Sequence, residues 1–135
     1  MTTPVIDLKG ATETIVAALH AKDIKNNDQL VEGAAAPNQR KALASACGCT
    51  ARDILELANR ADLARIKGVS GVYSDLLERA GVDTVKELAT RRPDNLQAKM
   101  AETNASLKLA ARAPTQAQVE DWVAQAKELP KLLTY

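Results

Sequence analysis

The sequence predicts an all-α fold, a single compact domain of eight or nine short helices. Three observations carry this prediction. Apolar residues make up 46% of the 135-residue chain, which is enough for a core. There is no Phe, only one Trp and two Tyr, so the core is built from Ala, Leu, Val and Ile, which favours closely packed helices. Helix-capping signals and apolar residues at helical spacing recur along the chain.

The first half of the chain predicts a short lead-in and four helices. Met1 to Lys9 form the lead-in. Its apolar side chains, which we expect beneath the helices, are those of Val5, Ile6 and Leu8. The predicted helices cover about 12–22, 26–35, 38–46 and 50–65. Their signals are the N-caps Thr12, Asn26 (a capping box with Gln29) and Thr50, the break at Pro37 and the stop at Gly48.

The stretch ARIKGVSGVYSDLLERAGVDTVKELA, residues 64–89, organises the rest of the chain. Gly68 and Gly71 bracket a hairpin, since glycine enters left-handed backbone conformations without a Cβ penalty. A helix over about 70–80 follows, and Gly81 ends it. Its expected inner face is Val72, Leu76, Leu77 and Ala80. Thr84 and Glu87 then form a predicted capping box for a helix over 84–91.

Three proline and threonine signals divide the remaining residues. Pro93 ends the helix over 84–91, and a helix over about 95–103 follows. Asn104 caps a further turn or two as far as Arg112. After Pro114, Thr115 caps the last helix, which ends at Pro130. Its expected inner stripe is Val119, Val123 and Ala126, with Trp122 adjoining. The tail from Lys131 to Tyr135 is too short to classify.

The two halves of the chain align with each other without a gap at a shift of 58 residues. This shift aligns Gly10 with Gly68, Thr12 with Ser70 and Asn26 with Thr84. Further along the chain the shift increases to 65 residues and aligns Thr50 with Thr115. We therefore expect one helical domain over 1–135, made of pseudo-repeats at about 4–65 and 66–135 that share one core.

The hairpin residues carry a resemblance to known proteins. Ile66-Lys67-Gly68-Val69-Ser70 followed by an amphipathic helix resembles a helix–hairpin–helix element. The whole chain is similar to a bacterial family, domain of unknown function 4332, whose members show RIKGVGP-like hairpins, a GVDTVKEL turn and a VEDWVAQAKELP-like final helix. The resemblance is strongest over Arg65–Leu88 and Gln118–Pro130.

The resemblance implies a phosphate-binding hairpin, because helix–hairpin–helix elements bind DNA without sequence preference. A backbone phosphate of DNA or RNA would meet the amides at the start of the hairpin helix, where an open helix N-terminus attracts anions. The residues implied are Arg65, Lys67, Gly68, Val69, Ser70 and Gly71. A second, poorer site in the first hairpin would comprise Lys9, Gly10 and Thr12.

Three features favour a different function, a protein-interaction or structural module, with a protein partner or a second copy of the chain. Ser70 stands where the family has a glycine, and Glu13 stands where Gly71 falls in the second hairpin. A carboxylate there competes with phosphate for the same amides. The formal net charge is only +1, whereas DNA-binding proteins usually carry a basic face. Both functions stay open at this point.

Local charge and the remaining motifs narrow the classes of function. Residues 38–68 are net positive. The nucleic-acid function gains support over the protein-interaction function if four cations of this segment converge beside the hairpin. These cations are Arg40, Arg60, Arg65 and Lys67. No segment reaches the roughly 18 apolar residues of a membrane span, and the N-terminus does not resemble a signal peptide, so we expect a cytoplasmic protein with no membrane partner.

No enzyme signature is present in the chain. Cys47 and Cys49 lack the spacing and the second ligand pair of a zinc site, so we expect a reduced, partly buried pair at a helix end. His20 is expected at the surface. We expect no acid–base pair among Asp75, Glu78 and Asp83, which are spread over the surface. We interpret Tyr73 as a packing residue and the Arg91-Arg92 pair as a solvated helix end. We expect no metal, no cofactor and no small-molecule substrate.

Overall fold

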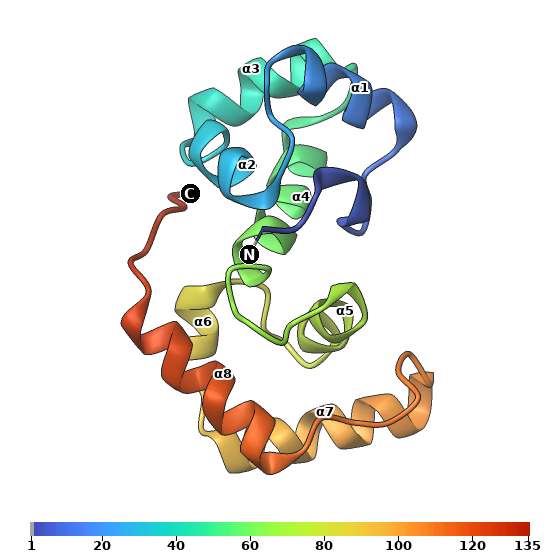
Figure 1. Cartoon of the computed structure of the whole chain (residues 1–135), viewed down its shortest axis with the longest axis vertical. Helices are drawn as coiled ribbons and strands as arrows, with labels where there is room; N and C mark the ends of the chain where they lie inside the picture. Colours follow the sequence, from blue (N-terminus) through green and yellow to red (C-terminus); the bar gives the residue numbers. More distant parts are fainter. Residues whose placement is uncertain (1) are drawn as a thin grey trace. The chain divides into compact units, whose positions relative to one another are not determined.

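The computed structural model describes residues 2–135 and confirms the all-α fold class. Within these residues the chain forms eight α-helices and one short 3-10 helix, η1, and no strand (Figure 1). The one β-type contact among the described residues is an isolated bridge between Pro4 and Asn26. Met1, the first residue of the predicted lead-in, lies outside the described part.

The helices belong to two compact units. The first unit is the chain up to Arg65 together with Leu132–Tyr135, and the second is Ile66–Lys131. The division after Arg65 falls where the sequence places the boundary between the repeats. The tail differs from the prediction, which placed it in the second repeat: residues Leu132–Tyr135 belong to the first unit. That the two units share one core stays a prediction.

The first unit contains η1 and four α-helices. They are η1 (Val5–Asp7), α1 (Glu13–Ala21), α2 (Asn27–Gly33), α3 (Pro37–Cys47) and α4 (Ala51–Leu63). Helix α4 packs against α2 and α3, and α1 packs against α3. The buried core cluster includes Val5, Leu8, Ile15, Val16, Leu19, Leu30, Val31, Leu43, Ile54, Leu57, Ala58 and Ala61. The lead-in prediction is wrong for Ile6, which is 65% exposed, because the turn of η1 buries only Val5 of its three residues.

The predicted N-caps of the first unit are confirmed. The side-chain oxygens of Thr12, Asn26 and Thr50 accept hydrogen bonds from amides three residues later. In the second of these caps, Gln29 accepts from the amide of Lys25 at 2.7 Å rather than from that of Asn26. Pro37 begins α3 as well as ending the preceding turn, since a proline at the first helical position gives up no intrahelical hydrogen bond.

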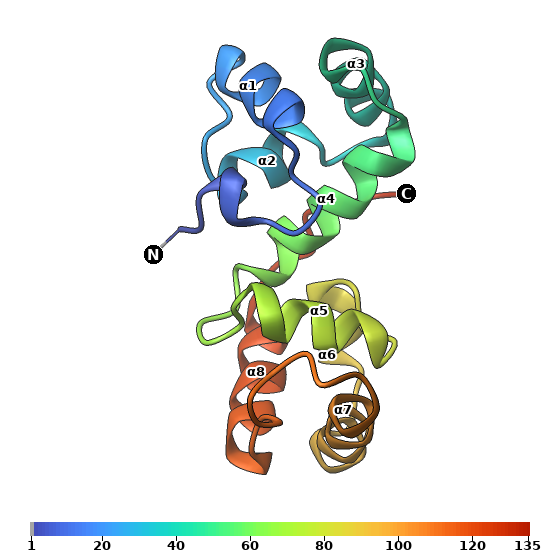
Figure 2. The same ribbon diagram turned by 90° about the vertical axis from the view of Figure 1, so that its right-hand side faces the viewer.

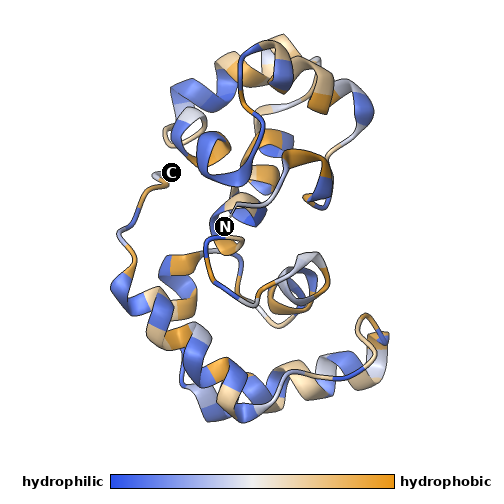
Figure 3. Cartoon of the chain, viewed as in Figure 1, coloured by the Kyte–Doolittle hydropathy of each residue, from blue (hydrophilic) through white to orange (hydrophobic). Residues whose placement is uncertain are grey.

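The second unit consists of four α-helices. They are α5 (Gly71–Arg79), α6 (Val85–Ala89), α7 (Pro93–Leu107) and α8 (Gln116–Glu128). Helix α8 packs against α6 and α7, and α5 packs against α7 (Figure 2). Figure 3 shows apolar and polar residues interleaved along the helices, as amphipathic helices require. The buried side chains include Leu76, Leu77, Val85, Leu88, Leu96, Met100, Val119, Trp122 and Val123.

Four local predictions for the second unit are wrong. Residues 93–107 form one continuous helix, and Asn104 lies inside it and closes the following loop by hydrogen bonds to the backbone of Ala110. Val72 is 46% exposed, because the buried face of α5 runs through Ser74 and Asp75 instead. Asp75 is therefore buried and not on the surface. The Glu87 carboxylate contacts Arg91 and so is drawn away from the helix N-terminus.

The local backbone of the two units agrees at aligned positions. Gly10 and Gly68 have φ values of +92° and +95°, and Asp23 and Gly81, again 58 residues apart, have +61° and +98°. Thr50 and Thr115 each form a capping box at the start of a 13-residue helix. These agreements support the predicted internal repeat but do not establish it.

The C-terminal tail is held on the first unit by Arg40, whose side chain is buried. The Arg40 Nη1 group donates to the carbonyl oxygens of Ala34 (2.9 Å) and Ala35 (3.1 Å), and Nη2 donates to that of Thr134 (2.7 Å). The Thr134 amide donates to the Ala35 carbonyl. Leu133 is buried in the core cluster, and the Arg40 guanidinium lies 5.7 Å from the centre of the Tyr135 ring. The tail therefore completes the first unit.

Candidate nucleic-acid interface

The candidate site is the turn between Ile66 and the start of α5. Gly68 has φ +95°, a conformation that L side chains rarely adopt, and it reverses the chain between Lys67 and Val69. Ser70 is the N-cap of α5, and its Oγ accepts from the Tyr73 amide at 3.5 Å. The serine that replaces the family glycine thus acts as a helix cap.

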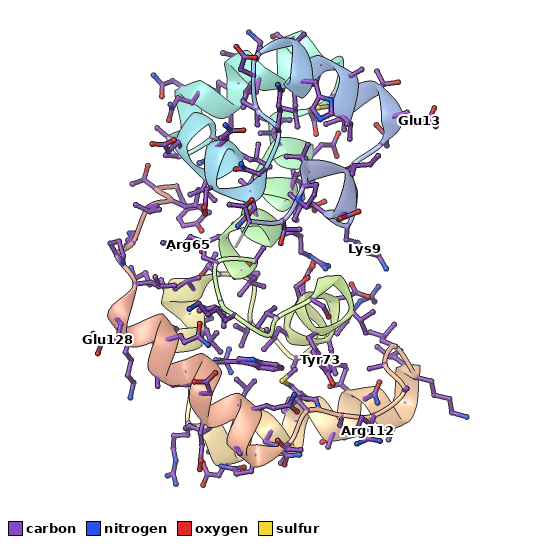
Figure 4. The ribbon with its side chains drawn as sticks, viewed as in Figure 1. Lys9, Glu13, Arg65, Tyr73, Arg112 and Glu128 are labelled. Atoms are coloured by element: carbon purple, nitrogen blue, oxygen red, sulfur yellow. The ribbon has the colours of Figure 1, made fainter. Side chains whose placement is uncertain are left out.

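The turn rests on α8 through Gln125 and Trp122, two residues that no sequence pattern links to the turn. The Gln125 side chain accepts from the Lys67 amide (2.8 Å) and donates to the Lys67 carbonyl (3.1 Å). A Cβ added at Gly68 would lie 3.0 Å from Nε1 of Trp122. The ring of Tyr73, labelled in Figure 4, lies 5.3 Å from that of Trp122, which confirms Tyr73 as a packing residue. No local signal predicts these contacts, since Gln125 follows Lys67 by 58 residues.

The turn presents backbone amides at the surface. The Val69 amide donates to Ile66 and is used within the turn. Among the hydrogen bonds of residues 2–135, none uses the amide of Gly68, Ser70 or Gly71, and all three residues are exposed. Lys67 is also exposed. The structure thus brings together the amides and one cation of the predicted site.

The first hairpin, in the first unit, has the same turn with different chemistry. Gly10 has φ +92°, and the Oγ1 atom of the N-cap Thr12 accepts from the Ile15 amide at 3.3 Å. Glu13 is the first residue of α1 and is exposed. In Figure 4 the side chains of Lys9 and Glu13 both point outward. A carboxylate therefore stands at the helix end where phosphate would bind.

The predicted site residue Arg65 and the two other arginines whose position discriminates the two functions, Arg40 and Arg60, are buried within the first unit. Arg65 donates to Asp62 Oδ1 from Nε (3.0 Å) and Nη2 (2.7 Å), and both side chains are less than a tenth exposed. Arg40 binds backbone carbonyls, and Arg60 is buried. The answer to the discriminating question is therefore that the four cations do not converge: three of them lie inside the fold, where ion pairing and carbonyl contacts compensate the loss of hydration. Lys67 is the exposed member of the set.

The cysteine pair is confirmed as a partly buried pair at a helix end. Cys47 is the last residue of α3 and is buried, Cys49 is half-buried, and both are free thiols. Burial raises the pKa of the Cys47 thiol. Burial also raises the pKa of the Cys49 thiol, with further contributions from Cys47 and Asp53. His20 is exposed, as expected.

These raised pKa values predict slow alkylation. At pH 7.5 we expect native protein to react with iodoacetamide more slowly than the same protein in urea, because the thiolate is the reactive form and a raised thiol pKa lowers its population. The rate should rise as the pH passes the ordinary thiol pKa of 9.0. Mass spectrometry of a time course gives both rates, and Cys49→Ser isolates Cys47. Equal rates in the native and unfolded protein would contradict the assigned environment.

The geometry of residues 2–135 also bears on metal binding and on membrane insertion. Within residues 2–135, no three His, Cys, Asp or Glu side chains gather closely enough to hold a metal ion. None of the helices in the same part of the chain combines enough length with enough apolar character for a membrane span.

The family described as Domain of unknown function (DUF4332) matches residues 9–129, nearly the whole chain. The chain belongs to this family. Neither the comparison with curated proteins nor that with solved structures found a match. The match spans both hairpins, so the Gly10 and Gly68 turns lie inside the DUF4332 domain.

Proposed function

We propose that this DUF4332 protein is a non-enzymatic binding module of the cytoplasm that holds a phosphate of the nucleic-acid backbone, without sequence preference. The hairpin before α5 is the binding element, as in helix–hairpin–helix proteins. The observation that carries the proposal is the exposed turn in which the amides of Gly68, Ser70 and Gly71 have no hydrogen-bond partner among the described residues.

The physical basis is the N-terminus of α5, a nine-residue helix. Its first amides and its dipole attract an anion, and the exposed ammonium of Lys67 adds a charge beside them. Contacts of Gln125 and Trp122 hold the turn in place, so little conformational entropy is lost on binding. One cation per hairpin gives weak binding, because duplex affinity scales with the number of phosphates neutralised.

A second candidate is a protein-interaction module. The burial of Arg40, Arg60 and Arg65 favours it, because these charges serve the fold and add nothing to a basic surface. The exposed Val72, directly after Gly71, adds an apolar contact that a protein partner uses better than a phosphate does.

The experiment is anisotropy of a labelled duplex titrated with the protein at several salt concentrations. We expect the logarithm of the association constant to fall with the logarithm of the salt concentration at a slope of about −1 to −2, which corresponds to the neutralisation of one or two phosphates. Lys67→Glu should abolish measurable binding, while Lys127→Glu, an exposed lysine on α8 with the same change in charge, should leave most of it. Absence of binding at about 50 mM salt, or equal losses in the two variants, would refute the phosphate proposal and favour the protein module.

A further inference from the structure

A cavity of about 320 Å³ lies in the second unit, where the ends of α5 and α6 meet the start of α7. It is separate from the hairpin, since it shares no residue with it. Its volume is that of a small-ligand site. The lining residues are Ala80, Thr90, Arg91, Arg92, Asn95, Leu96 and Lys99.

Three of the lining residues are cations and none is a carboxylate. Two of these cations have an acidic partner, since Glu87 contacts Arg91 and Asp94 contacts Arg92. Lys99 forms no ion pair within the residues that the structure describes, so the cavity keeps an excess of positive charge. A set of cations around a hollow favours an anionic ligand.

Arg91 is held in a fixed position. Its Nε and Nη2 groups donate to Glu87 Oε1 at 3.1 and 2.8 Å, and Nη2 also donates to the Gly81 carbonyl at 3.0 Å. Its Nη1 group takes part in none of the hydrogen bonds of residues 2–135. The guanidinium is therefore oriented by the protein and keeps two N–H donors for a ligand.

Arg92 can exchange its partner. It contacts Asp94 at 3.0 Å, but the two side chains are 75% and 55% exposed. Exposed pairs of this kind contribute little to stability, so an anion bound by several groups can replace Asp94. Lys99 follows Arg92 by two helical turns on α7, and Asn95 between them is exposed. The apolar side chains of Ala80 and Leu96 complete the lining.

We propose that this cavity binds a small molecule that carries a phosphate monoester. Once the ligand displaces Asp94, Arg92 and Lys99 offer two uncompensated positive charges to a dianion. Guanidinium groups bind phosphate oxygens in pairs, and the apolar lining accepts the body of the ligand. The proposal concerns a bound ligand and not a substrate. It does not rest on the hairpin, because it involves other residues and another end of α5.

The test is a titration of ¹⁵N-labelled full-length protein with inorganic phosphate and with phenyl phosphate, followed by amide shifts at constant ionic strength. We expect saturable shifts in residues 90–96, and tighter binding of phenyl phosphate because the apolar lining contacts its ring. Arg92→Gln combined with Lys99→Gln should weaken binding about tenfold or more, because two charged contacts are lost. Lys127→Gln, which removes one exposed charge on α8, is the control for non-specific attraction, and Lys67→Glu should leave the cavity titration unchanged.

Three outcomes would overturn the proposal. The first is the absence of saturation by either probe. The second is an equal loss of affinity in Lys127→Gln, which would indicate non-specific attraction to surface charge. The third is a short DNA duplex that shifts the residue 90–96 amides when phenyl phosphate does not, which would assign the cavity to nucleic acid. Because Lys67→Glu tests the hairpin alone, failure of one site is distinguishable from failure of the other.

Discussion

Replacing Arg40 with Ala will lower the free energy of unfolding by about 3 kcal/mol. The guanidinium is 4% exposed and donates to three carbonyl oxygens, two on the α2–α3 turn and one at Thr134 in the tail. The substitution removes three charge-assisted hydrogen bonds and leaves carbonyl groups partly buried without a donor. It also frees the tail, so Leu133 loses its anchor in the core.

Urea denaturation followed by circular dichroism measures the change. Lys41→Ala, the exposed neighbour on α3, is the control and should change stability by less than about 0.5 kcal/mol. Arg40→Lys should recover little, because a single ammonium cannot reach three carbonyls that a planar guanidinium spans. Hydrogen exchange at the Thr134 amide, which donates to Ala35, should accelerate in Arg40→Ala. An unchanged exchange rate there would show that Arg40 does not hold the tail.

Gly68→Ala will destabilise the protein by about 3 kcal/mol, whereas Gly10→Ala will cost only about 1–2 kcal/mol. Both glycines have nearly the same positive φ, so the backbone strain of an added Cβ is similar. They differ in their surroundings: the new Cβ at Gly68 lies 3.0 Å from Trp122 Nε1, and that at Gly10 has nothing within 4 Å. The difference between the two variants therefore measures the cost of displacing the indole.

The same urea titration compares the two variants, and tryptophan fluorescence reports on the second unit. The emission of Gly68→Ala should change, because Trp122, the one tryptophan of the chain, must move away from the turn. The emission of Gly10→Ala should not. Equal destabilisation of the two variants with unchanged fluorescence would show that the indole yields without cost.

Helix starts and stops could be predicted from the sequence because their causes are local. The side chains of Thr12, Thr50, Ser70 and Thr115 cap helices by bonding to amides three residues away. The positive φ of Gly68 and Gly81 likewise follows from residue type and position. The prediction was wrong where a side chain had two partners within reach, as at Asn104, which lies inside α7 and binds the loop after it.

Burial and charge could not be assigned in this way. An arginine in the sequence is normally expected at the surface, but Arg40 is buried because its partner Thr134, 94 residues further along the chain, packs against it. Lys67 and Gln125, which together orient the candidate hairpin, are 58 residues apart. Arg91 is oriented by a carbonyl in the preceding turn, and the cavity that it lines forms only when α5, α6 and α7 pack together.

Local chemistry alone was thus sufficient for the helical class, most helix boundaries, most N-caps and the turns at Gly68 and Gly81, but not for Gly71, which begins α5 without a positive φ. The packing of distant segments decided which cations reach solvent and which amides stay open to a ligand. The physical reason is that a cap or a turn depends on a few neighbouring residues, whereas the hydration of a charge depends on whatever part of the chain covers it.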